Sequence, residues 1–110
     1  MDITADPIDG GCLLIVAGEI DLSNVNIFIE RLFELSVDGD TKIILDLTDV
    51  EFVDSTALGT ILKSAGEIES AGKRLRIVCG DGPVRRLLEM TNLTNRFQLC
   101  PTRDEALAAA

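Results

Sequence analysis

The chain has 110 residues, enough for one packed core, and we expect a single domain over residues 1–110. Hydrophobic residues make up 46% of it and charged residues 26%, in interleaved order, which excludes a disordered chain. With 19 acidic against 10 basic residues the net charge is −9, so nucleic acids and anionic membrane surfaces are not expected partners.

The residue types that are missing or rare exclude most enzyme chemistry. There is no histidine, which excludes imidazole-based catalytic triads and most zinc sites, and we expect no cofactor. No segment has the pattern of a secretory signal or of a membrane span, which needs about 20 apolar residues, so we expect a cytoplasmic protein. The three cysteines lie far apart and are expected to be buried free thiols: Cys12, Cys79 and Cys100.

The first predicted elements are a strand and a helix. Residues 12–17 form an apolar run flanked by glycines, which predicts a strand, and residues 2–7 are expected to pair with it as a hairpin. Apolar residues then recur at helical spacing from Ser23 onward, with Asp21 or Ser23 as the predicted N-cap. The continuous apolar run at residues 43–45 is typical of a central strand covered on both faces.

The second half of the chain continues the alternation of helix and strand. Helical spacing returns at Leu58 and leads to Gly72, where a left-handed C-terminal cap is expected. A strand is predicted at residues 75–78, and Pro83 suits the first position of the next helix. A last short strand at residues 97–99 and a final helix complete the list, the helix opening with a capping box at Thr102 and Glu105.

This order predicts the fold class. Strands that alternate with helices require crossover connections and a largely parallel sheet, to which the N-terminal hairpin adds an antiparallel edge. We expect an α/β domain with a mixed, mostly parallel sheet of about four or five strands, flanked by about four helices.

Four acids follow the predicted central strand, where open α/β sheets often bind ligands: Asp46, Asp49, Glu51 and Asp54. They could hold magnesium, but acids solvated in a loop are the favoured interpretation. A receiver domain phosphorylated on Asp46 is a weaker alternative, because the adjacent acids and the late lysine that such domains need are not found.

Ser55 lies where the pattern changes from strand to helix. A hydroxyl at a helix start can cap the helix or carry a phosphate, and both readings are open at this point. Along the predicted helix, Leu58 belongs to the apolar stripe, whereas Thr56, Gly59 and Lys63 lie toward the opposite side. Glycine costs about 1 kcal/mol inside a helix, so Gly59 indicates either tight packing on the sheet or the close approach of another molecule.

The segment VDSTALGTIL resembles the DSSGLG-type signature of STAS domains, specifically the bacterial anti-sigma factor antagonists. The segment GEIDLSN resembles a second element of that family, and the hydrophobic strand ending in Asp-Leu is a third. The three elements occur in the family's order, at residues 18–21, 43–47 and 54–59, and the resemblance covers essentially the whole chain. Ala57 stands where the family usually has glycine.

The resemblance implies a regulatory switch without catalysis of its own. Such a protein, when unphosphorylated, binds an anti-sigma factor that is also a serine kinase and so frees the sigma factor. Phosphorylation then releases it, and a metal-dependent phosphatase of the PP2C type resets it. Carried onto this sequence, Ser55 is the phospho-acceptor. The residues expected to contact the kinase are Asp21, Ser23, Asp54, Thr56, Leu58 and Gly59.

Two further expectations accompany this interpretation. The protein is expected to be a monomer or a weak dimer. A STAS adaptor subunit of a lipid-transport or other signalling complex is the main alternative. In contrast to this chain, such relatives often lack the acceptor serine.

Overall fold

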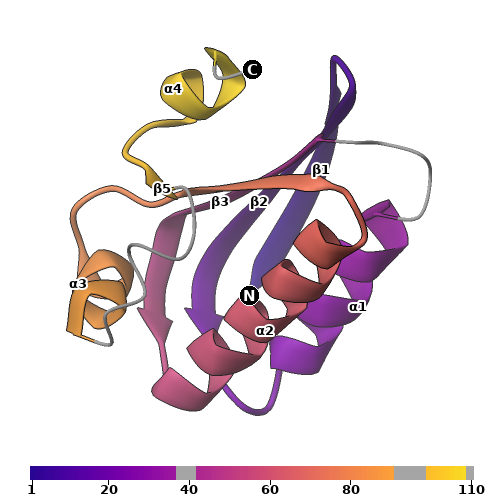
Figure 1. The fold of residues 1–110 in the computed structure, drawn as a ribbon. Helices are drawn as coiled ribbons and strands as arrows, with labels where there is room; N and C mark the ends of the chain where they lie inside the picture. The colour runs from indigo at the N-terminus through magenta and orange to yellow at the C-terminus, as the bar shows by residue number, and fades with distance from the viewer. Residues whose placement is uncertain (37–41, 91–98, 109–110) are drawn as a thin grey trace.

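The computed structural model describes residues 1–36, 42–90 and 99–108, which form five strands and four helices in one α/β arrangement (Figure 1). The strands lie in the sheet in chain order, from β1 to β5. The elements are β1 (Asp2–Ile8), β2 (Gly11–Ile20), α1 (Val25–Ser36), β3 (Lys42–Val53), α2 (Ser55–Ser70), β4 (Arg74–Val78), α3 (Pro83–Met90), β5 (Leu99–Cys100) and α4 (Arg103–Ala108).

The sheet is mixed, as the sequence predicts. Strands β1 and β2 pair antiparallel as a hairpin, and Gly10 at its turn has a φ of +74°, a conformation that favours glycine. The other three strand pairs are parallel, because each pair is joined by a helix that crosses over the sheet. The predicted fold class is therefore confirmed.

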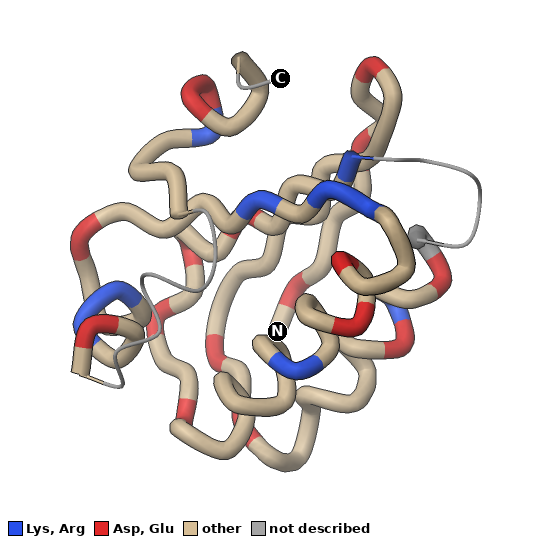
Figure 2. Tube along the Cα trace, viewed as in Figure 1, with Lys and Arg blue, Asp and Glu red and all other residues tan. Residues whose placement is uncertain are grey.

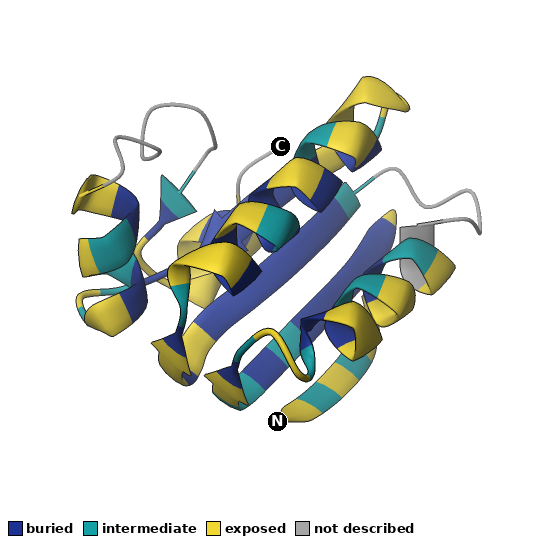
Figure 3. Ribbon diagram, turned by 90° about the horizontal axis from the view of Figure 1, so that it is seen from below, coloured by how far each residue is buried: buried dark blue, intermediate teal, exposed yellow. Residues whose placement is uncertain are grey.

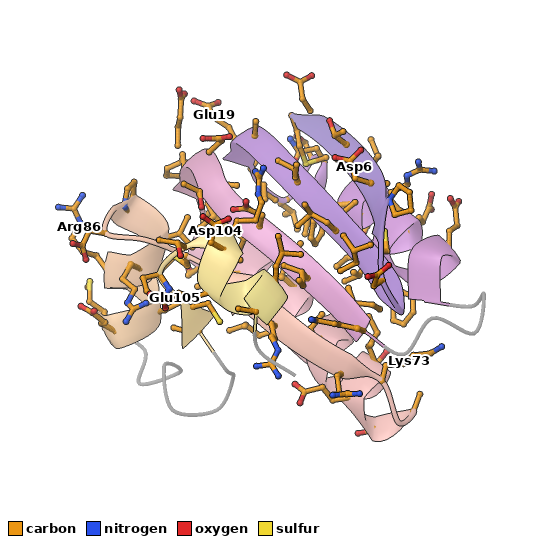
Figure 4. All side chains as sticks on the ribbon, turned by 90° about the horizontal axis from the view of Figure 1, so that it is seen from above. Asp6, Glu19, Lys73, Arg86, Asp104 and Glu105 are labelled. Atoms are coloured by element: carbon orange, nitrogen blue, oxygen red, sulfur yellow. The ribbon has the colours of Figure 1, made fainter. Side chains whose placement is uncertain are left out.

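The central strand β3 separates two hydrophobic clusters. Alternate residues of a strand point to opposite faces, and Ile43 and Leu45 belong to the large cluster under α1, α2 and α3, whereas Ile44 belongs to a smaller cluster with Ala106 of α4. Figure 3 shows the buried sides of α1 and α2 turned toward the sheet. Figure 4, seen from the side of α4, shows this helix over the sheet, with Asp104 and Glu105 on it.

Strand β3 extends well past the predicted residues 43–45 and reaches Val53. Asp46, Asp49 and Glu51 therefore lie in the strand, and the prediction that they are loop acids is wrong. Asp46 is only 2% exposed, and its carboxylate accepts hydrogen bonds from Arg103 Nε at 2.8 Å and from the Thr48 backbone N–H at 2.9 Å.

The structure also tests the other two interpretations of the acids, a magnesium site and a receiver domain phosphorylated on Asp46. Within the described ranges, no group of three or more acids or cysteines is placed to hold a metal ion. Because both oxygens of Asp46 are engaged and the residue is buried, the carboxylate is not presented to a phosphoryl donor as a receiver would require.

Several predicted element ends are confirmed. Gly72 follows α2 with a φ of +90°, Pro83 is the first residue of α3, and the Thr102 hydroxyl caps α4 by accepting the Glu105 N–H at 3.2 Å. Of the last predicted strand, Leu99 lies in β5 and residues 97 and 98 lie outside the described residues. Helix α1 begins at Val25, later than a cap at Asp21 or Ser23 would place it, and a turn precedes it.

The cysteines are buried and free, as expected: Cys12, Cys79 and Cys100. Burial raises the pKa of the Cys79 thiol, against the opposing effect of Arg85, so this thiol stays protonated at neutral pH. Among the helices in the described part of the chain, none has the length and apolar character needed to cross a membrane.

Candidate functional site

The candidate site forms at the edge of the sheet where β2 and β3 end side by side. Ile20 and Val53, the last residues of these strands, are paired in the sheet. Asp21 and Asp54 follow them directly and begin the two connections that lead into α1 and α2. Figure 1 shows both connections at the same end of the molecule. Two segments that are more than 30 residues apart in the sequence are therefore brought together.

Asp54 is the N-cap of α2. Its carboxylate Oδ1 accepts the backbone N–H of Ala57 at 2.7 Å, which satisfies one of the unpaired donors at the helix start. The other oxygen, Oδ2, accepts the N–H of Leu22 at 3.3 Å in the neighbouring connection. Of the two readings left open for Ser55, the cap is therefore excluded: Ser55 is the first helical residue and is exposed.

The turn before α1 is organised around Asp21. Its carboxylate accepts the backbone N–H of Ser23 at 2.8 Å and also the Ser23 hydroxyl. The Asn24 side chain spans the same turn, accepting the Asp21 N–H and donating to the Glu19 carbonyl, both at 2.9 Å. Asn24 was not among the predicted site residues, although a polar run before an apolar helix is a usual sign of such a turn.

The same hydrogen bonds keep Asp21 ionised. The Ser23 hydroxyl, together with the Ser23 backbone N–H, holds the pKa of the Asp21 carboxyl below its usual value. Asp21 therefore carries a negative charge throughout the neutral range. The prediction of Asp21 or Ser23 as the N-cap is not confirmed, because α1 begins at Val25 and the Asp21 carboxylate bonds Ser23 in the turn before the helix. Only the backbone carbonyl of Asp21 reaches the helix, accepting the Val25 N–H at 2.9 Å.

The outer side of α2 carries the residues expected there. Thr56, Gly59 and Lys63 are exposed, while Leu58 is buried in the main core and only 2% exposed. The prediction that Leu58 contacts a partner is therefore corrected, because its side chain packs under the helix. The other predicted contact residues lie at this end of the molecule and are at least partly exposed, namely Asp21, Ser23, Asp54, Thr56 and Gly59. Their role in binding stays a prediction.

Gly59 is not required by the packing of α2. Apart from its two chain neighbours and the backbone of its own helix nearby, a Cβ built at this position would meet no atom of the described residues within 4 Å. Tight packing against the sheet, one of the two explanations left open, is therefore excluded for this glycine as far as the described structure extends. The other explanation, the close approach of another molecule, remains.

Ala57 stands where STAS domains, which the sequence resembles, usually have glycine. It lies on the inner side of the helix. Its side chain is 0% exposed and belongs to the main cluster. The extra methyl group therefore fills the core and does not add to the outer surface around Ser55.

The surroundings of Ser55 are acidic. Residues 19–28 and 50–59, which build this end of the molecule, contain four acids and no lysine or arginine. The acids are Glu19, Asp21, Glu51 and Asp54. Figure 2 shows acidic positions where β2 and β3 lead into the helices. A surface of this kind favours a partner with basic groups and disfavours any added negative charge.

The capping geometry predicts different stabilities for two neighbouring substitutions. Asp54→Ala removes the cap and the bond to Leu22, so we expect the free energy of unfolding to fall by about 1–2 kcal/mol. Ser55→Ala leaves the cap in place and should change it by less than about 0.5 kcal/mol. Urea unfolding of both variants measures this difference. A larger loss for Ser55→Ala than for Asp54→Ala would contradict the assignment of the cap.

Comparisons with known proteins agree with this architecture. The family model described as STAS domain matches residues 2–106. The anti-sigma-F factor antagonist RsfB of Mycobacterium tuberculosis is 30% identical over 105 residues, which cover 96% of this chain and 85% of RsfB.

Solved structures show the same fold. The crystal structure of an anti-sigma factor antagonist from Mycobacterium paratuberculosis matches with a TM-score of 0.87 and 25% identity, covering 96% of this chain and 90% of that one. The anti-sigma factor antagonist SpoIIAA, a Bacillus cell fate determinant, matches in two forms. The unphosphorylated form has a TM-score of 0.76 and 20% identity, and the match covers 96% of this chain and 93% of that one. The phosphorylated form has a TM-score of 0.71 and 19% identity, and the match covers 96% of each chain. The chain therefore belongs to the STAS domain family, among relatives named anti-sigma factor antagonists.

Proposed function

We propose that this protein is an anti-sigma factor antagonist that works as a phospho-switch. Unphosphorylated, it binds an anti-sigma factor that is also a serine kinase, and the sigma factor is released. Phosphorylation of Ser55 by that kinase ends the interaction, and a phosphatase of the PP2C type restores it. The protein acts in the cytoplasm, as a monomer or weak dimer, and catalyses no reaction itself.

The observation that carries the proposal is the position of Ser55. Its hydroxyl is exposed at the first residue of α2, while Asp54 supplies the cap. Because the cap does not depend on Ser55, the hydroxyl can be modified while the helix start keeps its hydrogen bonds. A partner kinase would supply the ATP, the magnesium and the general base, so the absence of histidine from the sequence is no obstacle.

The charges around Ser55 explain how a phosphate would act. A phosphoserine carries about −1.5 to −2 charges at pH 7, and the start of a helix tolerates such a group. Asp21 and Asp54 already make this surface negative. The added charge therefore acts mainly on the complex, through repulsion and the desolvation of the phosphate, and leaves the fold intact. The two solved forms of the distant relative SpoIIAA support a switch of this type.

The test is phosphorylation by the anti-sigma kinases encoded in the same genome. We expect one of them, with ATP and magnesium, to add a single phosphate, which intact-mass analysis and peptide mapping place on Ser55. Ser55→Ala should remain unmodified. Ser55→Asp should lose binding to the kinase while it keeps the melting temperature of the wild type.

Other results would contradict the proposal. They include a phosphate on Asp46, Ser23 or Thr56 in place of Ser55, and a large loss of folding stability in Ser55→Asp. Stable co-purification with a transporter ATPase that is insensitive to Ser55→Ala would instead support the adaptor alternative.

A further inference from the structure

Three large apolar side chains are exposed at this end of the molecule, within residues 19–28 and 50–59. Phe52, 51% exposed, precedes Val53 of the main cluster in β3 and therefore points to the other face of the sheet. The other two belong to the segment that leads into α1. Leu22, in the turn before α1, is 67% exposed, and Ile27, in the first turn of α1, is 61% exposed. A single exposed apolar residue is ordinary on a protein surface. Two exposed apolar residues beside a candidate binding site are less ordinary, because clusters of exposed apolar side chains often mark interaction surfaces.

Ile27 lies on the outer side of α1, as Gly59 lies on the outer side of α2. The buried stripe of α1 consists of Val25, Phe28 and Leu32, and Ile27 lies on the opposite side of the helix. Gly59 lies in the same way opposite the buried stripe of α2. Helices α1 and α2 cover the same face of the sheet (Figure 3). Since Ile27 and Gly59 lie opposite the buried stripes, both are on the sides of their helices that face away from the sheet.

The two helices also begin at the same end of the molecule. Each follows a strand of the parallel pair β2 and β3, so their first turns lie at the same edge of the sheet (Figure 1). Ile27 belongs to the first turn of α1, and Gly59 begins the second turn of α2. Leu22 lies in the connection between β2 and α1, where its N–H is bound to the carboxylate of Asp54. This bond fixes the backbone of Leu22 beside the residue that precedes Ser55.

We propose that Leu22 and Ile27, the apolar patch, are the contact surface that anchors the anti-sigma kinase beside Ser55. The inference rests on the proposed function. It assigns to the kinase a surface that is apolar where it meets the patch. Around that contact the kinase carries lysine or arginine, since Asp21 and Asp54 lie next to Leu22. Gly59, on the outer side of α2, leaves open space that a side chain of the kinase can fill.

The acidic residues and the apolar patch then have different tasks. The acids provide electrostatic attraction, which speeds association and weakens in salt. The apolar side chains provide contact area that salt does not screen, and the residues that dominate binding energies are usually of this desolvated kind. Phosphorylation of Ser55 counteracts the electrostatic part and leaves the apolar part unchanged.

The experiment measures the affinity of the unphosphorylated protein for the kinase that modifies Ser55, with a non-hydrolysable ATP analogue so that Ser55 stays unmodified. The variants are Leu22→Ser, Ile27→Ser and the double variant. Serine suits position 27 because its helix propensity is close to that of isoleucine. Met90→Ser on α3 is the matched control, since Met90 is an exposed apolar residue outside the patch.

We expect each single variant to raise the Kd about tenfold, and the double variant more. The ratio of variant to wild-type Kd should stay the same between about 50 mM and 500 mM salt. Melting temperatures should not change, because both side chains are exposed, and Met90→Ser should bind like the wild type.

The possible failures are distinguishable. If the wild type is phosphorylated on Ser55 and the double variant binds as tightly as the wild type, the inference is overturned and the proposed function stands. If the variants change only the self-association of the protein, in light scattering, the patch joins two copies of this chain and the inference is also overturned. If no anti-sigma kinase binds or modifies the wild type, the proposed function fails and the inference with it.

Discussion

Replacing Gly59 with alanine should stabilise the domain and, at the same time, weaken its binding to the anti-sigma kinase. Alanine lowers the cost of the helical conformation by about 1 kcal/mol, which raises the melting temperature of a domain of this size by about 4 °C. Outside its two chain neighbours and the nearby backbone of its own helix, the added Cβ meets no described atom within 4 Å, so it causes no clash with the rest of the described structure. A methyl group in a close-packed interface costs about 1–3 kcal/mol, or about tenfold to a hundredfold in Kd.

Two measurements on a graded series test this prediction. Thermal unfolding should show Gly59→Ala and Gly59→Leu as more stable than the wild type, and the Kd for the kinase should rise with the size of the side chain. Glu67→Ala, at another exposed position on α2, is the control and should leave the Kd unchanged. Unchanged affinity in both Gly59 variants would show that no partner approaches the helix at this point.

The second large effect concerns the ion pair between Arg103 and Asp46. Arg103→Met should lower the free energy of unfolding by about 2 kcal/mol, because it leaves the buried Asp46 carboxylate with fewer hydrogen bonds. The loss is smaller than for a fully buried pair, since the Arg103 side chain is 42% exposed. The bond also attaches the start of α4 to the sheet, while the Lys42 ammonium group donates to the Leu107 carbonyl near its end, at 3.2 Å.

Urea unfolding at pH 7 measures this loss. Asp104→Ala, which changes an exposed neighbour of Arg103, is the control and should be close to neutral. The combined variant Asp46→Leu with Arg103→Met should recover much of the stability, because it removes the buried charge together with its partner. Phosphorylation of Ser55 should proceed at the wild-type rate in Arg103→Met. Neutral behaviour of Arg103→Met would mean that the ion pair contributes little to stability.

Much of the fold could be predicted because it depends on short-range patterns. The apolar run at residues 43–45 indicated a central strand, and helical spacing after Ser55 indicated α2. Pro83 and Gly72 marked element ends through their backbone preferences, which any fold must respect. The family signature located Ser55 at a helix start in the same way, because the signature is itself a local pattern.

The errors arose where residues distant in the sequence decide the outcome. Asp46 appeared to be a loop acid because its partner, Arg103, is 57 residues away, and the pair lets β3 continue through a charged position. Asp54 caps α2 through its bond to Ala57, and its second oxygen also holds Leu22, 32 residues earlier, a contact that no local pattern shows. Leu58 belonged to the apolar stripe and to the family signature, and its burial removes it from the binding surface.

The sequence by itself determined the fold class, the family and the position of the candidate phosphorylation site, because periodicity and a continuous motif are readable along the chain. The tertiary structure decided which residues surround that site. Pairing of Ile20 with Val53 brings Asp21 and Leu22 beside Asp54 and Ser55, and parallel packing of α1 and α2 turns Ile27 and Gly59 toward the same side. The physical reason is that a surface is formed by the packing of separate segments, and no single segment contains the information for it.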